Sequence, residues 1–391
     1  MTICFITYQH VSEFRGGVER VTTMLAKGFK AKGDNVYMLS TLPPIDCDKL
    51  LDNQFVLPHG TINSKENRDF LSSFIAKYRV EIIINQSEVK AILELIKSSE
   101  PDIPVISVIH TDPAAAIKAV QDNWDYWKIQ YGSLKFSLLS PILFLRKTYQ
   151  RYTRKKYTKN KHLFYYNQSN ATVLLSEKFF DSFKSLAGIK DTSKLYAISN
   201  PQTITRVQDT DTTKKGNVVL FVGRLVFQKR LDRLFRIWNR IKDKNDWRLI
   251  IVGDGPDRVF YENLCKKWHV KKVEFAGQCA PLPYYQKSKI LCITSSHEGY
   301  GLTITEGMQH NVIPIAYNSY ESIEDIITNG IDGFTIRPFS TSGYSKTLER
   351  LMNDTSYRES ILANIRKRNI RNIHSIDGIV EQWRELFKSI N

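Results

Sequence analysis

Two glutamates beside an apolar run have the types and spacing of ligand-binding residues. Glu298 and Glu306 are separated by seven residues and follow the β-rich run 289–294. In open α/β sheets, ligands bind at the carboxyl ends of the strands. Gly301 allows backbone N–H groups to approach an anion, and a helix expected to start near Thr303 points its positive end at the same place. The segment therefore suits a phosphorylated ligand with hydroxyl groups.

The same segment also has a purely structural interpretation. Thr303 and Glu306 fit a capping box, in which the glutamate reaches back to a backbone N–H at the start of a helix. Taken alone, this segment favours helix capping and ligand binding equally.

Two cations follow an earlier apolar run at residues 218–222. Arg224 and Lys229 flank a short turn in Gly223-Arg-Leu-Val-Phe-Gln-Lys229. At the end of a strand, both side chains could bind one diphosphate and neutralise the charge that develops as it leaves. A solvated basic loop is the alternative.

Two glycine turns and a histidine complete the candidate residues. Asp254 and Gly255 belong to a Gly-Asp-Gly-Pro turn that would let a base or ribose pack closely, although such turns are common in α/β folds. Gly16 and Gly17 precede a helix and suit a phosphate or a sugar, or else form a plain βα turn. His110 ends the run 105–109 and is either a structural hydrogen-bonding group or a ligand contact. The chain contains neither a G-x-G-x-x-G fingerprint nor a P-loop.

Strand and helix patterns alternate through both halves of the 391 residues, which is typical of βαβ units around parallel sheets. Strands are expected at residues 3–7, 35–40, 55–58, 81–85, 105–109, 171–175 and 195–198, and at 218–222, 248–252, 273–275, 290–294, 312–316 and 334–336. Helices are expected at 18–32 and 376–390. We expect two doubly wound, Rossmann-like α/β domains, 1–201 and 202–375, facing each other across a cleft. The polar stretch 202–216 would link them, and the helix in 376–391 would cross back to the first domain.

The composition, 42% hydrophobic and 25% charged, describes a soluble globular protein. Five cysteines show neither metal-ligand spacing nor a paired framework, so buried, reduced thiols in a cytoplasmic protein are expected. The amino terminus lacks the basic region of a signal peptide, and no stretch reaches the roughly 18 apolar residues of a membrane span. Membrane association should therefore be peripheral, at the inner face.

The order of these motifs resembles the nucleotide-sugar-dependent, retaining glycosyltransferases of family 4, which have the GT-B fold. The resemblance depends on GGVE at 16–19, the strand-end histidine, GRLxxxK at 223–229, GDGP at 253–256, and E-x7-E at 298–306 followed by Asn311-Val-Ile-Pro-Ile315. It covers nearly the whole chain and is strongest from residue 218 to 336. Each motif is weak alone, but their order and spacing are specific.

The resemblance implies a role for each candidate residue. Arg224 and Lys229 would bind the donor diphosphate, and Glu298 would hold hydroxyls of the donor sugar. Glu306 would bind the nucleotide ribose, and His110 would contact the transferred sugar. Other donor contacts are implied for Gly16, Gly17, Asp254, Gly255, Gly301 and Leu302. Two positions depart from the family's pattern, Arg230 where a glycine usually follows the lysine, and residues 307–309, but neither removes a charged ligand.

The net charge of +16 is concentrated in one part of the chain. Between Asp125 and Glu177 there are ten Lys and Arg residues and no acidic residue. Aromatic residues alternate with the cations in the insert at about 126–166, which suits an anionic membrane surface, nucleic acid or a solvated helical face. The membrane or acceptor surface is favoured over nucleic acid, which is not expected as a partner. It would involve Arg146, Lys147, Arg151, Arg154, Lys155 and Lys156.

We therefore expect a glycosyltransferase that moves a sugar from a UDP-sugar, less favourably a GDP-sugar, to a glycan or lipid-linked acceptor in surface polysaccharide biosynthesis. Attack on the face that the diphosphate leaves would retain the anomeric configuration. No metal and no cofactor are expected, because two cations and helix dipoles can replace a metal, and Asp209-Thr-Asp211 falls in the linker. A nucleotide-sugar epimerase of the same fold and a nucleic-acid-binding protein are the alternatives.

Overall fold

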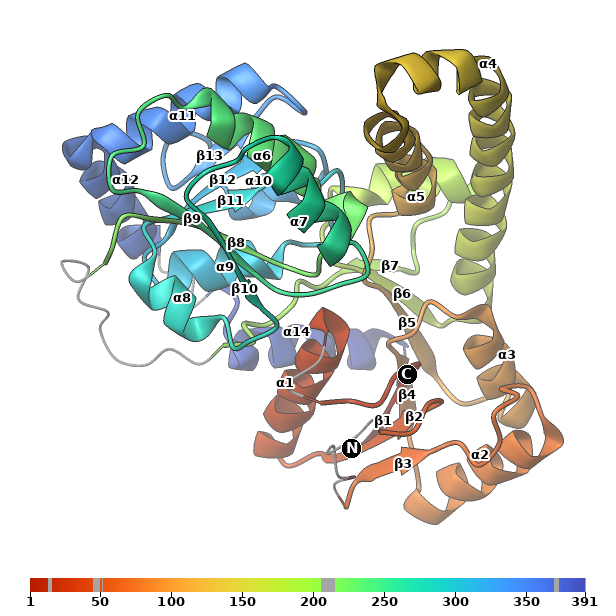
Figure 1. Ribbon diagram of the computed structural model, residues 1–391. Helices are drawn as coiled ribbons and strands as arrows, with labels where there is room; N and C mark the ends of the chain where they lie inside the picture. Colours follow the sequence, from red (N-terminus) through yellow and green to blue (C-terminus); the bar gives the residue numbers. More distant parts are fainter. Residues whose placement is uncertain (13–15, 45–49, 51, 205–214, 369–372, 391) are drawn as a thin grey trace. The chain divides into compact units, whose positions relative to one another are not determined.

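The computed structural model describes residues 1–12, 16–44, 50, 52–204, 215–368 and 373–390 (Figure 1). The chain forms two compact units. The first unit contains residues 1–114, 155–203 and 374–391, and the second contains 115–154 and 204–373. Each unit is built on one parallel β-sheet, as the alternating pattern predicted.

The sheet of the first unit has seven strands in the order β3-β2-β1-β4-β5-β6-β7. Its strands are β1 Thr2–Thr7, β2 Asn35–Ser40, β3 Gln54–Val56, β4 Ile82–Asn85, β5 Val105–Ile109, β6 Ala171–Leu174 and β7 Leu195–Ala197. The order reverses between β1 and β4, and in open α/β sheets ligands bind at the carboxyl ends of the strands beside such a reversal.

Helices cover both faces of this sheet. They are α1 Gly17–Ala31, α2 Lys65–Tyr78, α3 Lys90–Ser99, α5 Phe179–Ala187, α14 Ile376–Ile390 and the last turns of α4 Ala115–Gln168. The final helix, α14, packs on α1, where the rings of Phe29 and Phe387 stack 5.6 Å apart (Figure 1). A Cβ atom on Gly28 would lie 2.6 Å from Ile376, so the glycine allows the two helices to approach closely.

The sheet of the second unit has six strands in the order β10-β9-β8-β11-β12-β13. Its strands are β8 Val218–Val222, β9 Arg248–Val252, β10 Val273–Gly277, β11 Ile290–Ile293, β12 Ile313–Tyr317 and β13 Phe334–Ile336. The helical elements are η2 Phe227–Lys229, α6 Leu231–Arg240, α7 Arg258–Lys267, α8 Leu282–Lys287, α9 Leu302–Gln309, α10 Ile323–Ile326, α11 Thr341–Asn353 and α12 Thr355–Arg368. Because the central strands are buried on both faces, nearly every residue in them is apolar. The expected bounds of all strands differ from the observed ones by at most two residues.

The first part of α4 forms a helical hairpin, residues 115–154, which belongs to the second unit. Gly132 has non-helical dihedral angles (φ 73°, ψ 171°) and breaks the helix. The two arms then pack together: the ring of Phe136 lies 5.0 Å from that of Trp124, and Lys147 Nζ donates to Gln121 Oε1 at 2.7 Å.

This grouping differs from the domain bounds expected from the sequence, which placed the basic insert wholly in the first domain. The physical reason is that the hairpin packs on the second unit, because the ring of Tyr126 lies 5.1 Å from that of Phe227 and 4.8 Å from that of Phe260. Most of the expected linker, residues 205–214, lies outside the described residues.

A buried histidine in the first unit makes its stability depend on pH. The ring of His162 is 1% exposed and lies 4.6 Å from the ring of Phe183, and Nε2–H donates to the carbonyl oxygen of Pro113 at 2.9 Å. The buried Nδ1 has no hydrogen-bond partner in the described part of the chain. Burial lowers the pKa of His162 to about 4, although Pro113 opposes the shift. The folded protein therefore holds this side chain neutral where an unfolded chain would protonate it.

We predict that lowering the pH from 7 to 5 destabilises the first unit through His162. Stability is lost as the pH falls from the ordinary histidine pKa of about 6.5 toward 4, and the loss at pH 5 should be about 2 kcal/mol. His162→Gln keeps a donor to Pro113 and should remove the His162 share of this pH dependence, while the buried His110 of the same unit keeps its own share, measured by denaturant unfolding with hydrogen exchange. His59→Gln, at an exposed histidine, is the control, and an equal flattening there would contradict the prediction.

Candidate functional site

The sequence-predicted cation and carboxylate of the second unit meet at the carboxyl edge of its sheet. Lys229 Nζ lies 2.5 Å from Glu298 Oε1, and the same oxygen accepts a hydrogen bond from Ser295 Oγ at 2.6 Å. Both charged side chains are largely buried, 19% and 15% exposed. An ion pair shielded in this way is stronger than one on the open surface.

Two loops carry this pair, and we call them the Lys229 loop (residues 223–230, after β8) and the Glu298 loop (residues 294–301, after β11). Several hydrogen bonds besides that of the pair connect them. The Gln228 amide donates to the carbonyl oxygen of His297 at 2.7 Å, and the Gln228 carbonyl oxygen accepts from the backbone N–H of Ser296 at 2.9 Å. Thr294 Oγ1 donates to the carbonyl oxygen of Lys229 at 2.9 Å. A displacement of one loop should therefore displace the other.

Arg224 extends from the same loop with its side chain exposed. In the described part of the chain, its guanidinium has neither a hydrogen bond nor an ion pair. The glycine turn after β9 supports the loop, because the N–H of Leu225 donates to the carbonyl oxygen of Asp254 at 2.8 Å. A Cβ atom on Gly255 would lie 2.4 Å from the carbonyl oxygen of Leu225. This turn needs its glycine to support the loop, whatever it contributes to a ligand.

The carboxylate of Asp254 is already engaged within its own turn. It accepts from Arg258 Nη1 at 2.8 Å and from the N–H of Gly255 at 2.7 Å. These hydrogen bonds, with the backbone bond to Gly255 contributing most, lower the pKa of Asp254. The side chain is exposed enough to reach a ligand while it holds the turn.

Glu306 does not form the capping box that the sequence allowed. Helix α9 begins after Gly301, which has the left-handed conformation (φ 94°, ψ 49°), with no side-chain cap. The Glu306 side chain is fully buried, and its Oε2 accepts from the hydroxyl of Tyr285 at 2.9 Å. At Gly307, where the sequence departs from the family's pattern, a Cβ atom would lie 2.8 Å from the side chain of Leu291, so a larger residue would displace that side chain.

Tyr320 is a site residue that sequence reasoning missed. Its side chain is 3% exposed, and its hydroxyl has no hydrogen-bond partner among the described residues. That hydroxyl lies 3.2 Å from where a Cβ atom of Gly301 would be, and burial, followed by the charge of Glu298, raises the pKa of Tyr320. The available signal was its position, three residues past the carboxyl end of β12.

Three further predicted residues, His110, Gly16 and Gly17, belong to the first unit. His110 follows β5, and its Nε2 contacts the amide oxygen of Gln86. Glu88 holds the next residue by accepting from the N–H of Thr111 at 3.0 Å, and Lys161 Nζ lies 2.6 Å from Glu88. Burial lowers the pKa of His110 to about 4, against the opposing charge of Glu88, so the ring is neutral at pH 7.

Gly16 and Gly17 lie at the start of α1, which follows β1. Gly16 is the N-cap residue with an extended backbone (φ −65°, ψ −179°), and no side chain caps the helix. The first N–H groups of α1 are thus presented by glycines at the carboxyl edge of the first sheet, a suitable place for an anion.

Two further observations concern metals and thiols. In the ranges that the structure describes, no three His, Cys, Asp or Glu side chains gather as metal ligands. The thiols of Cys4, Cys265 and Cys292 are free and buried, whereas that of Cys279 is free but exposed, which corrects the expectation that all are buried.

Comparison with known proteins defines the class of domain. The sequence model for "Glycosyl transferases group 1" matches residues 204–368. One relative is GalNAc-alpha-(1->4)-GalNAc-alpha-(1->3)-diNAcBac-PP-undecaprenol alpha-1,4-N-acetyl-D-galactosaminyltransferase of Campylobacter jejuni. The two chains are 29% identical over 181 aligned residues, and these cover 45% of this chain and 49% of that protein. It is 26% identical over 203 residues to the amylovoran biosynthesis glycosyltransferase AmsD of Erwinia amylovora, 51% of this chain and 57% of that one. The chain thus spans about half the length of the curated relatives it matches.

The solved structure of HepE from Anabaena in complex with UDP and glucose covers 100% of both chains with a TM-score of 0.72 at 15% identity. This likeness confirms the expected fold class, two parallel-sheet α/β domains of the GT-B type. The chain carries a group 1 glycosyltransferase domain in its second half. That domain contains Arg224, Lys229, Glu298 and Glu306.

Removal of the hydroxyl should affect protein stability differently at Tyr285 and at Tyr320. Tyr285→Phe removes a donor from the buried Glu306 carboxylate and should lower stability by roughly 1–3 kcal/mol. Tyr320→Phe removes a buried hydroxyl that has no partner and should leave the melting temperature unchanged or raise it. Thermal unfolding of both variants without ligand checks this, and a marked loss of stability in Tyr320→Phe would show that its hydroxyl is paired.

Proposed function

We propose that this protein is a retaining glycosyltransferase of family 4 that transfers a sugar from a UDP-sugar to a glycan or lipid-linked acceptor in surface polysaccharide biosynthesis. The observation that supports it most is the Lys229–Glu298 pair at the carboxyl edge of a group 1 glycosyltransferase domain. The names of several relatives indicate polysaccharide synthesis, including amylovoran and capsular polysaccharide. UDP is favoured over GDP because the HepE and TarM structures contain UDP.

In the proposed site, the two loops bind different parts of the donor. An incoming diphosphate would take Lys229 from Glu298, and Arg224, which is exposed in the same loop, would bind the same group. Glu298 would then be free to accept hydrogen bonds from hydroxyls of the sugar. Helix α9 would direct the N–H groups after Gly301 at the phosphates. Tyr320 is a further hydroxyl that could bind the donor.

Glu306 is proposed to bind the ribose, while Tyr285 holds its carboxylate from the other side. Asp254 and Gly255 would lie near the base. In the first unit, Gly16 and Gly17 would contribute N–H groups, and neutral His110 would contact the transferred sugar as a hydrogen-bonding group and not as a cation.

In the proposed reaction, the bond between the anomeric carbon and the diphosphate oxygen breaks, and a bond from that carbon to the acceptor oxygen forms on the same face. The proton of the acceptor hydroxyl passes to an oxygen of the leaving diphosphate. Arg224 and Lys229 stabilise the negative charge that develops there. We propose that no metal is obligatory, so activity should persist in EDTA.

A thermal-shift screen with UDP- and GDP-sugars tests the proposal. A UDP-sugar at 100 times its Kd should stabilise the protein by about 2.7 kcal/mol. Glu298→Ala should lose the part of this stabilisation that depends on the sugar but keep that of UDP, and Lys229→Ala should lose both. No stabilisation of the wild type by any nucleotide sugar would refute the function, and an epimerised nucleotide sugar formed without acceptor would indicate an epimerase.

We further propose that the enzyme works at an anionic membrane surface through α4. Of the six predicted surface cations, Arg146, Arg151, Arg154, Lys155 and Lys156 are exposed, whereas Lys147 is half-buried against Gln121. The helical hairpin also exposes large apolar side chains, with Leu134 79% and Leu138 75% exposed. Others on this stretch are Ile142, Phe144, Leu145, Tyr149 and Tyr152. No described helix has the length and apolar character needed to cross a bilayer, so binding would be peripheral.

Vesicle flotation with and without phosphatidylglycerol checks the surface. Neutralising Arg154, Lys155 and Lys156 should weaken binding to anionic vesicles roughly a hundredfold, at about 1 kcal/mol for each cation. Leu134→Ser with Leu138→Ser should weaken binding through lost apolar burial. The matched control is Val259→Ser with Ile331→Ser, which changes two exposed apolar residues elsewhere. Unchanged binding by the charge variant, or preference for nucleic acid over vesicles, would exclude the membrane role.

A further inference from the structure

Arg230, next to the ion-paired Lys229, is the most heavily buried cation among the described residues of the second unit. Its side chain is 1% exposed, and its backbone is left-handed (φ 54°, ψ 45°). That conformation costs a residue other than glycine roughly 1–2 kcal/mol. A glycine would avoid this strain. The ion pairs of the Arg230 side chain offset the free energy that the strained backbone costs.

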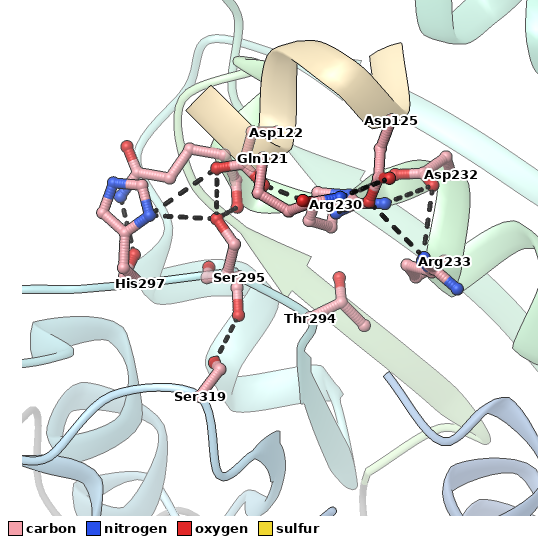
Figure 2. Close-up of polar contacts among 12 residues, drawn as sticks. Gln121, Asp122, Asp125, Arg230, Asp232, Arg233, Thr294, Ser295, His297 and Ser319 are labelled. Atoms are coloured by element: carbon pink, nitrogen blue, oxygen red, sulfur yellow. Dashed lines mark hydrogen bonds and ion pairs between the residues drawn. The ribbon is translucent and has the colours of Figure 1, made fainter. Parts of the chain in front are cut away.

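The side chain is enclosed by three carboxylates (Figure 2). It binds Asp232 through two parallel hydrogen bonds, Nε to Oδ1 at 3.0 Å and Nη2 to Oδ2 at 3.1 Å. Its third nitrogen, Nη1, lies 2.9 Å from Asp125 and 3.4 Å from Asp122, both on the first arm of the helical hairpin. Arg233 adds a second guanidinium, 3.6 Å from Asp125. Three carboxylates share two cations, and burial raises the pKa of Asp122 to about 6.

Asp122 also reaches the other loop of the candidate site. Its Oδ2 accepts a hydrogen bond from Ser296 Oγ at 2.6 Å. The same oxygen lies 3.6 Å from Nδ1 of His297, which Figure 2 shows beside Asp122. One carboxylate of the hairpin therefore contacts Arg230, the neighbour of Lys229, and Ser296, two residues before Glu298.

We propose that Asp122 and Arg230 are positioning residues, through which the helical hairpin holds the Lys229 and Glu298 loops at the separation that donor binding requires. The hairpin is thus part of the support of the donor site as well as a surface feature. This inference depends on the proposed function, since it concerns the geometry of the donor site. Neither residue is assigned a contact with the donor.

The proposed effect of Asp122 is to restrict the positions of the two loops. Gln228 and Thr294 connect the loops to each other, while the turn after β9 holds the Lys229 loop and Ser319 holds the Glu298 loop. The Asp122 carboxylate adds a further point of attachment, on a separate helix, that is shared by both loops. Loss of that point should let both loops shift together, and displacements of about 1 Å at reacting groups can lower rates a hundredfold.

Donor-binding measurements on substituted, intact protein test the proposal. Asp122→Ala should weaken UDP-sugar binding and lower kcat/KM roughly 10- to 100-fold. Asp122→Asn keeps the shape and one acceptor oxygen, and should recover most of the loss. Arg230→Gly suits the left-handed backbone but removes the ion pairs, so it should resemble Asp122→Ala in donor affinity if both fold.

The matched control is Asp332→Ala, which removes another buried carboxylate of this unit, ion-paired with Arg368 at 2.5 Å. It should lower the melting temperature and leave donor affinity unchanged when measured well below unfolding. Equal donor affinity in Asp122→Ala, Asp122→Asn and wild type would overturn the positioning role, even if stability falls. If the wild type binds no nucleotide sugar, the proposed function fails instead, so the two failures are distinct.

Discussion

The candidate site depends on one buried charge cluster, in which Arg230 joins segments far apart in the chain. Taking charges out of water costs several kcal/mol for each ion unless they are paired, and removing one partner of a buried pair typically costs about 3–5 kcal/mol. The cluster therefore tolerates little rearrangement. It brings Asp122 and Asp125, from the hairpin, to Asp232 at the start of α6 and to the loop after β11. Residues more than 100 positions apart are held within hydrogen-bond distance.

Lys229 and Glu298 are also partly buried charges, and each of them needs a partner. Both side chains are mostly shielded from solvent, and each pairs with the other. A phosphorylated ligand would replace one partner of each by an oxygen anion or by hydroxyl groups, so neither charge would be left unpaired. This exchange also explains why Ser295, which donates to Glu298, is useful: it stabilises the carboxylate in both states.

The sequence predicted the parts of the molecule that depend on local pattern. Strands buried on both faces must be apolar, so β1, β5, β8 and β9 were recognisable to within a residue. Lys229 and Glu298 were each expected at the carboxyl end of a strand, and the structure shows that those strands, β8 and β11, are neighbours. The order of motifs led to the same fold class that the comparisons confirm.

What the sequence did not reveal depends on contacts between distant segments. Arg230 was a small departure from a motif, because no local pattern shows that Asp122 and Asp125 enclose it. The fit of Glu306 to a capping box was misleading, since a hydroxyl 21 residues away takes its carboxylate. Charge and aromatic content described the basic insert, but only packing of Tyr126 on Phe227 and Phe260 shows which unit it joins.

The interleaving of the two units has a consequence for how the chain can fold during synthesis. Helix α14 buries Ile379, Val380, Trp383 and Phe387 in the first unit, although it is made after the whole of the second. The face of α1 that stacks on it stays uncovered until α14 has been synthesised. The second unit, in turn, needs residues 115–154, which are synthesised before the last two strands of the first. Neither unit corresponds to a continuous stretch of the gene, so neither can be completed, or cut out, as a simple fragment.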